Sequence, residues 1–586
     1  MLFLTLGMTM RFMTNALAEG PKDPIRVFRV ADYGAKPGSE ADAVPAIRAA
    51  IAAARALNGK PAVIEFTPGR YRCFGGKLRP DGKTHQPSIE IHGLSNVTIE
   101  GKGATLVGRE MAGLFYISES HDIAIRNLNV DWDPLPHTSG RVVRLIPEDH
   151  AFDIVPGIPE KPVAGRIVQG ILAYNPVLHR LADNGWEMYQ TQGECDATPT
   201  ELTPEGYLRI FEARRSPLPD VGWHVVVRHQ VYGYDAFTFV GCNNVQMDNV
   251  TVNAVPGMGV SGANCRDVTI RRLKVIPSDG GWMSATADAM HFNACRGQIT
   301  VEDSELAGMG DDAINIHAMY GLVTARIDDY TLAVGRARMH PYYDKIRAIW
   351  DAPQKGDTLE YSGGAEPLLA QGQLHVADAH QDNAQQRTII QFTETLPVDV
   401  GVSTVLSNLS TSPSVRIRRC KVHSNRARGL LLQSRDMIVE DCTFEDISGA
   451  GIQICTDAAD WWESMGTRDV TVQRCNFRRC NFGVACRSAA LDIFSDLPAG
   501  KQAAAGVHQR LHILNNTFEG NTGAAIHVGS TDTAEVRGNS FAVGDNPALL
   551  VVNSHNVTIA GNTLKSGKGG VDVRGSSDRA TIHVDD

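Results

Sequence analysis

Two adjacent carboxylates, Asp311 and Asp312, stand in the segment GMGDDAINIH at residues 308–317. An earlier segment, DAMHF at residues 288–292, aligns with the DAINI at residues 312–316, which places Asp288 against Asp312. If the two segments are neighbouring rungs of a repeat, three carboxyl groups and two imidazoles gather on one small patch, because hydrogen-bonded strands lie about 4.8 Å apart.

Carboxyl groups at such separations raise the pKa of at least one member, and proton-transfer catalysis is one reason to retain such a cluster. Hydrolysis of a glycosidic bond needs a carboxylic acid that protonates the leaving oxygen and a carboxylate that acts across the sugar. In inverting enzymes the two groups lie about 6.5–9.5 Å apart with water between them, and side chains that diverge from neighbouring rungs can reach that separation. Two other interpretations stay open, namely solvated turn acids and a calcium site, since clustered carboxylates suit a hard cation.

The short sequence pattern that begins at Asp288 recurs along the chain. Its second position is always Gly or Ala, its third and fifth positions are apolar and face the core, and its fourth and sixth positions face outward, because side chains alternate along a strand. The first position holds Asp288, Asp312 and Arg428 in successive repeats. The aligned segments are MGVS at 258–261, DAMHFN at 288–293, DAINIH at 312–317, RGLLLQ at 428–433, AGIQIC at 450–455, FGVAC at 482–486 and GGVDV at 569–573.

The spacing of these segments predicts an all-β solenoid, a parallel β-helix. Near the C-terminus Asn516, Asn539 and Asn562 recur at one constant spacing, and a short, constant period with one polar ladder is typical of stacked coils. The three Asn-Val-Thr sequons are interpreted as turn-and-strand chemistry of the repeat rather than as glycan sites; they begin at Asn96, Asn249 and Asn556.

The N-terminal part predicts a capping element. Val44, Ile47, Ile51 and Ala54 recur at helical spacing over residues 42–58, and a strand follows at 62–66. This opening resembles the start of the right-handed β-helices of the pectate-lyase superfamily, in which a helix covers the open end of the solenoid. A stack of coils needs such a cap because its end coil exposes both core and strand edge.

Two Pro- and Gly-containing stretches with short β patterns interrupt the repeat and predict inserted all-β, barrel-like domains. The second insertion leaves the solenoid directly after His317, so it can form a wall beside any site built on the Asp-Asp strand. The expected boundaries are a signal peptide at 1–18, the N-terminal part of the β-helix at 19–134, a first inserted domain at 135–223, the catalytic coils at 224–318, a second inserted domain at 319–413 and the C-terminal part of the β-helix at 414–586.

Composition narrows the class of partner and the compartment. The net charge of −10 argues against a nucleic-acid partner, and no apolar run is long enough for a membrane span. An apolar start followed by a small-x-small site ending at Ala18 predicts a signal peptide and export, to the periplasm or to the medium. The eleven cysteines form no metal-binding spacing, and Cys420, Cys442 and Cys475 are interpreted as stacked buried thiols.

The arrangement of Asp288, Asp311 and Asp312 resembles the catalytic trio of polygalacturonases, which are inverting hydrolases on a β-helix. In those enzymes a following strand carries cations that bind the substrate carboxylate. Here the matching positions hold Leu431 and Gln433, which favours a neutral sugar.

A more extensive resemblance, covering most of the chain, is to glycoside hydrolase family 110. It rests on GDDAINIH at 310–317, NRARGLLLQ at 425–433 and AGIQI at 450–454 through WWES at 461–464. The resemblance implies an exo-acting, inverting α-1,3-galactosidase that removes terminal galactose, as from blood group B structures. It implies Asp311 as general acid and Asp288 with Asp312 as the base pair, without a metal or cofactor.

The predicted partner is a galactose-terminated oligosaccharide or glycoconjugate, and formation of a homo-oligomer is left open. Two other classes stay open, a polysaccharide lyase on the same fold and a non-catalytic glycan-binding solenoid. Trp282 is a further aromatic side chain that could stack on a sugar. The candidate sugar contacts are His291, Asn293, Asn315, His317, Arg428, Gln433, Trp461, Trp462 and Glu463.

Overall fold

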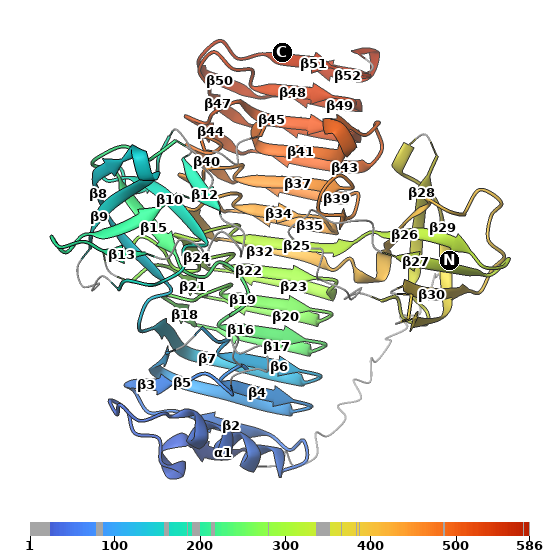
Figure 1. Cartoon of the computed structure of the whole chain (residues 1–586). Coiled ribbons are helices and arrows are strands. Elements are labelled where there is room, and N and C mark those ends of the chain that lie inside the picture. Colours follow the sequence, from blue (N-terminus) through green and yellow to red (C-terminus); the bar gives the residue numbers. More distant parts are fainter. Residues whose placement is uncertain are drawn as a thin grey trace, which may run out of the picture.

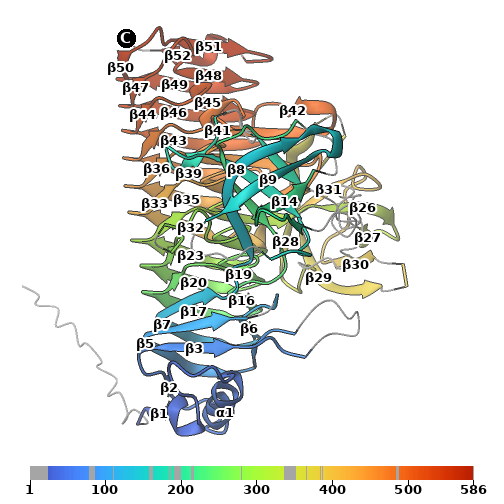
Figure 2. The same cartoon turned by 60° about the vertical axis from the view of Figure 1, so that its left-hand side comes forward.

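The computed structural model describes residues 24–584, except for 78–85, 110, 158–162, 184–185, 190–199, 213–216, 279, 336–351, 365, 383, 386, 484–486 and 578. The predicted signal peptide at 1–18 lies outside the described residues. The chain winds into a tall stack of parallel strands that runs from the N-terminal end to the C-terminal end (Figures 1 and 2). The prediction of a parallel β-helix is therefore confirmed.

The catalytic coils belong to a 14-stranded sheet on one side of the solenoid, which we call the site sheet. Its main path runs in chain order, because each coil adds one parallel strand to the last. Two short strands, β38 (Glu463–Ser464) and β42 (Lys501–Gln502), pair antiparallel to it. The main strands are β4 (Ile89–His92), β6 (Phe115–Ser118), β16 (Phe237–Val240), β19 (Val260–Ala263), β22 (Met290–Asn293), β25 (Ile314–Met319), β34 (Leu430–Leu432), β37 (Ile452–Asp457), β41 (Ala489–Leu497), β45 (Ala524–Gly529), β48 (Leu549–Val552) and β51 (Val571–Arg574).

The other large sheet of the solenoid has 24 strands, and its inward apolar residues complete the core. Its strands are β1 (Arg26–Arg29), β2 (Ala62–Glu65), β3 (Arg70–Cys73), β5 (Ser95–Gly108), β7 (His121–Trp132), β17 (Asn243–Asp248), β18 (Thr251–Val252), β20 (Arg266–Arg271), β21 (Lys274–Val275), β23 (Arg296–Glu302), β24 (Glu305–Ala307), β32 (Ser414–Arg418), β33 (Lys421–His423), β35 (Arg435–Glu440), β36 (Thr443–Glu445), β39 (Arg468–Gln473), β40 (Asn476–Arg478), β43 (His508–Leu514), β44 (Thr517–Glu519), β46 (Thr531–Arg537), β47 (Ser540–Ala542), β49 (His555–Ala560), β50 (Thr563–Ser566) and β52 (Ile582–Val584).

The predicted cap and polar ladder are both present. Helix α1 (Val44–Arg55) begins with Pro45 in its first turn, buries one apolar face and lies across the N-terminal end of the stack (Figure 1). At the C-terminal end the backbone N–H of Asn516 donates to Oδ1 of Asn539 at 2.8 Å, and that of Asn539 donates to Asn562 at the same distance. Each ladder asparagine thus satisfies a buried donor of the coil before it.

The sequon asparagines adopt the turn geometry expected of them. Asn96, Asn249 and Asn556 have φ angles of 56°, 54° and 52°, the left-handed region that asparagine tolerates better than most residues. This backbone conformation explains why asparagine recurs where the chain enters or leaves a strand.

Two β units project from the solenoid on either side of β25 (Figure 1). The first is an antiparallel sheet whose last strand extends to Arg228, and the second is a closed six-stranded barrel; each has a hydrophobic core of its own. The first contains β8 (His137–Ile146), β9 (Ala151–Pro156), β10 (Gly170–Asn175), β11 (Arg180–Leu181), β12 (Glu187–Tyr189), β13 (Glu201–Leu202), β14 (Leu208–Phe211) and β15 (His224–Arg228). The barrel contains β26 (Gly321–Arg326), β27 (Thr331–Gly335), β28 (Thr358–Gly363), β29 (Glu366–Asp382), β30 (Arg387–Phe392) and β31 (Val405–Asn408).

One aligned segment was wrong. The sequence alignment placed residues 482–486 in the site sheet, but the strand that pairs with β37 is β41, with Ile452 opposite Leu491. The coil between these two strands is longer than the repeat, so constant spacing does not locate the next strand of the sheet. Residues 484–486 are outside the described residues.

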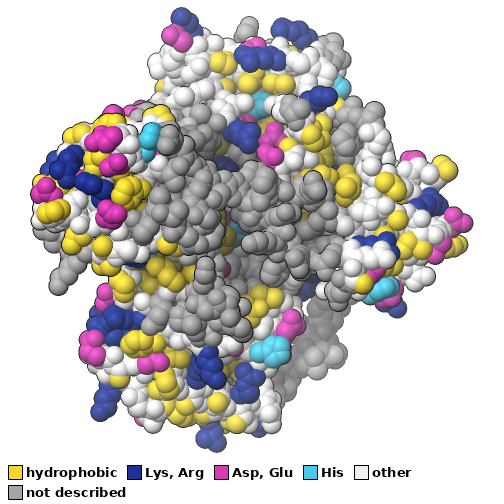
Figure 3. Space-filling view, in the orientation of Figure 1, with side chains coloured by type: hydrophobic (Ala, Val, Ile, Leu, Met, Phe, Trp, Pro, Cys, Tyr) yellow, Lys and Arg dark blue, Asp and Glu magenta, His cyan; other side chains and the backbone are white. Residues whose placement is uncertain are grey.

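The remaining global features agree with the composition. Nine cysteines among the described residues are buried free thiols, including Cys420, Cys442 and Cys475. The face drawn in Figure 3 mixes acidic and basic side chains over its described surface. Within the described ranges, no helix combines the length and apolarity that a membrane span requires.

Candidate active site

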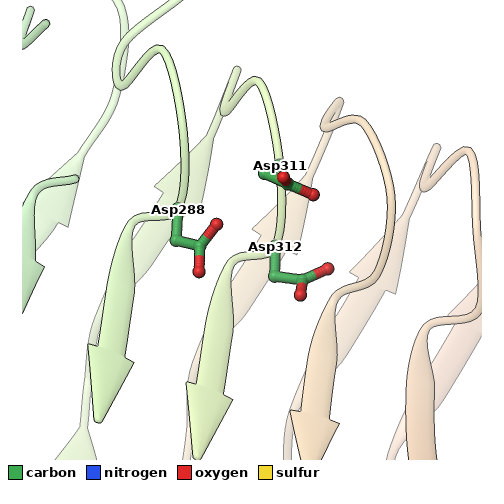
Figure 4. A group of neighbouring side chains, drawn as sticks. All are labelled: Asp288, Asp311 and Asp312. Carbon is green, nitrogen blue, oxygen red and sulfur yellow. The ribbon is translucent and has the colours of Figure 1, made fainter. Parts of the chain in front are cut away.

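The carboxyl trio Asp288, Asp311 and Asp312 is built where the chain enters two neighbouring strands of the site sheet. Strand β22 pairs with β25 in parallel, with Met290 opposite Ile314, so the predicted alignment of Asp288 with Asp312 is confirmed. Figure 4 shows Asp288 and Asp312 at equivalent positions before these strands, with Asp311 on the loop that leads into Asp312. The repeat itself therefore stacks two of the carboxyl groups, and the adjacent residue adds the third.

The three carboxyl groups are close together and nearly shielded from solvent. One oxygen of each lies within 4.8 Å of the others, and the residues Asp288, Asp311 and Asp312 are 3%, 8% and 1% exposed. Burial without compensation is costly for carboxylates, so their partners decide which of the three can carry charge.

Two arginines from the loop before β34 compensate two of the three acids. Arg428 donates to Asp312 through its backbone N–H at 2.9 Å and through Nη2 at 2.6 Å. Arg426 Nη1 donates to Asp311 Oδ1 at 2.7 Å, and the Tyr232 hydroxyl donates to the other oxygen of Asp311. Because guanidinium groups already pair with two of the acids, the trio is less suited to a divalent cation than its spacing alone indicates.

Because the three acids have different neighbours, their pKa values shift in different directions. Burial raises the pKa of Asp288 well above its ordinary value, and the charge of Asp311 adds to the effect. Burial likewise raises the pKa of Asp312 to about 7, although Arg428 opposes it. Burial also acts to raise the pKa of Asp311, but Arg426, Arg428 and Tyr232 outweigh it and hold that pKa below its ordinary value. The resting site thus favours an ionised Asp311 and a proton held elsewhere in the trio.

The first inserted sheet reaches into the site through its last strand. Arg228, at the end of β15, is fully buried and donates through Nη1 to the backbone oxygens of Thr286 at 3.0 Å and Gly310 at 3.1 Å. These two carbonyls stand immediately before the segments that carry the trio. A Cβ on Gly310 would lie 2.3 Å from the Thr286 oxygen, so the close approach of the two loops requires glycine there.

The same sheet also supports Arg426. Glu187 on β12 accepts from Arg426 Nε at 2.9 Å and from Nη2 at 3.0 Å, which leaves Nη1 directed at Asp311. Asn425, fully buried, donates to the backbone oxygens of Asp311 and Arg428 and so ties the arginine loop to the aspartate loop. The position of Asp311 is therefore fixed from two directions, by a coil of the solenoid and by the insertion.

Several predicted sugar contacts lie on the site sheet beside the trio. Strand register places His291 next to Asn315 and Asn293 next to His317. The side-chain oxygens of Asn293, Asn315, Gln433 and Gln453 are buried without a hydrogen-bond partner among the described residues. These positions were expected to face outward, but Asn315, His317 and Gln433 are buried, because further chain covers this part of the sheet.

Four of the predicted contacts, namely Arg428, Gln433, Glu463 and His317, are engaged with protein groups. Arg428 pairs with Asp312, and Glu463 on β38 accepts from Gln433 Nε2 at 2.7 Å while its other oxygen lies 3.9 Å from Nε2 of His317. Leu431, at the position where polygalacturonases carry a cation, packs with Cys455 and Phe494 in a small apolar cluster.

The tryptophans differ in their surroundings. Trp461 is 40% exposed, whereas Trp462 packs partly buried against the cluster that contains Tyr320. Trp282 stacks on His179 and His224 with ring centroids 4.7 and 4.1 Å apart, so its ring joins the insertion to the catalytic coils. Of the three tryptophans, Trp461 is therefore the one whose ring is exposed enough for a sugar to stack on it.

The site also contains four residues that were not predicted from the sequence, namely Tyr232, Arg228, Glu187 and Arg426. Arg426 stands inside the quoted segment at 425–433, so the alternation of Arg426 and Arg428 was an available signal. The other three belong to the insertion or its exit, where local sequence carries no sign of which coil they approach.

Comparison with known proteins agrees with the fold. The right handed beta helix region family matches residues 406–541 and 493–586. The chain is 26% identical to Alpha-1,3-galactosidase A of Shewanella woodyi, over 83% of this chain and 81% of the relative. It is also 26% identical to Alpha-1,3-galactosidase B of Bacteroides thetaiotaomicron, over 84% and 82%. A solved family 28 exopolygalacturonase of Yersinia enterocolitica aligns with 96% of this chain and 78% of its own, at 12% identity and a TM-score of 0.47.

Proposed function

The chain is a homologue of the curated bacterial α-1,3-galactosidases, which are glycoside hydrolases, and on that premise we propose that it removes terminal α-1,3-linked galactose from glycans with inversion at the anomeric carbon. The observation that carries the proposal is the buried trio of Asp288, Asp311 and Asp312, held by two guanidinium groups beside a polar face. Two carboxyl groups in complementary protonation states are the minimum that glycoside hydrolysis requires.

In the proposed mechanism, Asp311 protonates the glycosidic oxygen as the bond to the anomeric carbon breaks. Asp312, with Asp288 beside it, takes a proton from a water that attacks the opposite face of the sugar. The resemblance supports inversion, whereas the spacing does not select it: the nearest oxygens of the trio lie within 4.8 Å, closer than the roughly 6.5–9.5 Å typical between the groups of inverting enzymes.

A neutral sugar fits the surroundings of the trio. The unpartnered oxygens of Asn315, Gln433 and Gln453 can accept hydrogen bonds from hydroxyl groups, and the apolar cluster at Leu431 can contact a C–H face. A uronate would instead need a cation, and Leu431 replaces one. These features support a neutral terminal sugar, and the resemblance to α-1,3-galactosidases makes galactose the sugar that we propose.

The low solvent exposure of the three acids supports exo action. Each member of the trio is less than one-tenth exposed, and the two inserted units rise on either side of β25 (Figure 1). Acids with this little exposure suit the end of a glycan better than the middle of a polymer chain.

Proton NMR of a fresh digest of a blood-group-B-type trisaccharide tests the proposal. We expect β-galactose to appear first in the anomeric region and α-galactose to follow by mutarotation. Initial α-galactose would mean retention and would overturn the assigned roles. Absence of galactose release from α-1,3-galactosides would overturn the activity itself.

A further inference from the structure

A chain of hydrogen-bonding contacts leads from Asp288 away from the other two acids. Asp288 Oδ2 lies 2.8 Å from Nδ1 of His291, and Nε2 of His291 lies 2.9 Å from Nε2 of His317. At the far end, Nδ1 of His317 lies 3.0 Å from the backbone oxygen of Ala318. We call Asp288, His291 and His317 the histidine relay.

The contact with Ala318 at the end of the relay determines how many protons the relay holds. A carbonyl oxygen can only accept, so Nδ1 of His317 carries a proton and donates it to Ala318. The contact between the two Nε2 atoms needs one proton between them, and the contact between His291 and Asp288 needs another. The relay therefore holds three protons in total, one more than a carboxylate and two neutral imidazoles would supply.

The surroundings favour placing the additional proton on Asp288. When both imidazoles are neutral, His317 accepts at Nε2, so His291 donates from Nε2 and presents a lone pair at Nδ1, to which only a protonated Asp288 can donate. Asp311 and Glu463 face Asp288 with negative charge, Arg428 faces it with positive charge, and the backbone N–H of Asp312 donates to it. Glu463, Asp312, Asp235 and Asp311 face His291 with negative charge, and Glu463 also lies 3.9 Å from Nε2 of His317. Burial lowers the pKa of His291 and raises that of Asp288, in agreement with a neutral imidazole beside a carboxylic acid.

Asp311 has the opposite environment. Both of its oxygens accept hydrogen bonds, one from Arg426 and one from Tyr232. A general acid needs a proton before the glycosidic bond breaks, and the resting contacts of Asp311 favour the ionised form. Asp311 must therefore gain a proton before the glycosidic bond breaks.

We propose that the histidine relay stores the proton that Asp311 delivers to the glycosidic oxygen, and that His291 and His317 are positioning residues which keep Asp288 protonated at rest rather than ligands of the sugar. This inference rests on the proposed function. It also distinguishes the two members of the base pair, because Asp312 is then the carboxylate available at rest.

The proton balance closes over one turnover. The stored proton passes from Asp288 to Asp311 through one bridging water, because the carboxyl oxygens of the two residues lie within 4.8 Å of each other without a direct hydrogen bond among the described contacts, and then to the leaving oxygen. The attacking water forms the new bond to the anomeric carbon and gives its proton to the base pair. That proton returns to Asp288, so the relay is refilled and no other proton donor is consumed.

The first test is the pH dependence of kcat/KM for His291→Gln. Glutamine can either accept from or donate to Asp288, so it no longer requires a protonated acid at that position. The alkaline limb reports loss of the stored proton, and we expect it to move to lower pH by about one unit or more, a tenfold loss of proton affinity. KM at the optimum should stay nearly unchanged.

His512→Gln is the matched control, since it removes a partly exposed imidazole that pairs with Glu535 in the C-terminal coils. Its pH profile should coincide with that of the unaltered protein. An unmoved alkaline limb in His291→Gln together with a strongly raised KM would overturn the relay and make His291 a sugar ligand.

Neutron diffraction of the unaltered protein near pH 6 tests the relay without activity or substitution. We expect deuterium on Nδ1 of His317, on Nε2 of His291 and on Oδ2 of Asp288, whereas a deuteron on Nδ1 of His291 would place the additional proton on the imidazole and overturn the inference. Absence of the deuteron on Oδ2 of Asp288 would overturn the inference even if the galactosidase activity is present. If galactose release fails while all three deuterons are present, the proposed function fails and the protonation pattern stands.

Discussion

Two carboxyl–imidazole pairs on the site sheet differ in what surrounds them. In the C-terminal coils Asp492 contacts Nδ1 of His527 at 2.6 Å, and its second oxygen accepts from the backbone of Ser488 at 2.9 Å. In the catalytic coils Asp288 contacts His291 at 2.8 Å, but two further carboxyl groups lie within 4.8 Å. The first pair satisfies a buried acid locally, whereas the second belongs to a charged cluster balanced from other loops.

The same contrast holds at the first position of the repeat. Asp235 stands before β16 as Asp288 stands before β22, and it accepts from Met258 N at 2.9 Å and from the Ser261 hydroxyl at 2.5 Å. An acid at this position is therefore not by itself a site. The catalytic coils differ because their acids are neighbours and their counter-charges come from Arg426 and Arg428.

The largest expected effect separates these two kinds of acid. Asp311→Asn removes the proposed general acid, so kcat should fall by roughly 10²–10⁴-fold while circular dichroism shows an intact fold. Asp235→Asn is the matched control and should retain most of the activity. Near-normal turnover by Asp311→Asn would remove the distinction between the two positions.

A second prediction concerns the scaffold side of the comparison. Asn539→Ala deletes the acceptor of the buried Asn516 N–H and should lower the free energy of unfolding by about 1–3 kcal/mol. The kcat and KM of the folded fraction should not change. Chemical denaturation and initial rates measure the two effects, and a change in KM would mean that the ladder also shapes the site.

The third prediction takes an amide from the site instead. Asn315 has an unpartnered oxygen among the described residues, so Asn315→Ala should cost little stability. It should raise KM for the galactoside by roughly 2- to 10-fold, equivalent to about 0.5–1.5 kcal/mol for one hydrogen bond. If stability falls instead and KM is unchanged, Asn315 belongs to the scaffold.

Much of the fold was predictable because a β-helix repeats locally. The apolar alternation and the constant spacing determine which residues stack, and they aligned Asp288 with Asp312 correctly. The alignment failed at residues 482–486, because the coil from Ile452 to Leu491 is longer than the repeat. Periodicity predicts register only while coil length is constant.

The partners of the trio were less predictable. Tyr232 and Glu187 reach the site through the first inserted sheet and its exit, and the sequence of an insertion does not reveal the face on which it packs. For the same reason Asn315 and Gln433 were expected to face outward but are buried. Strand alternation assigns a side of the sheet, whereas burial depends on what later covers that side.

The smallest expected effect compares Asp288 and Asp311 through stability. The folded-state pKa of Asp288 is raised, so its contribution is fully present below the unfolded pKa, about 3.9, and is lost as pH rises through the folded value. The side chain in Asp288→Asn stays neutral at every pH. The Tm of this variant relative to that of the unaltered protein should therefore be higher at pH 8 than at pH 5. Asp311 has a lowered pKa and stabilises above the unfolded pKa, so Asp311→Asn should lose Tm at both values. Thermal unfolding at the two pH values measures both differences, and parallel behaviour of the two variants would mean that one environment governs all three acids.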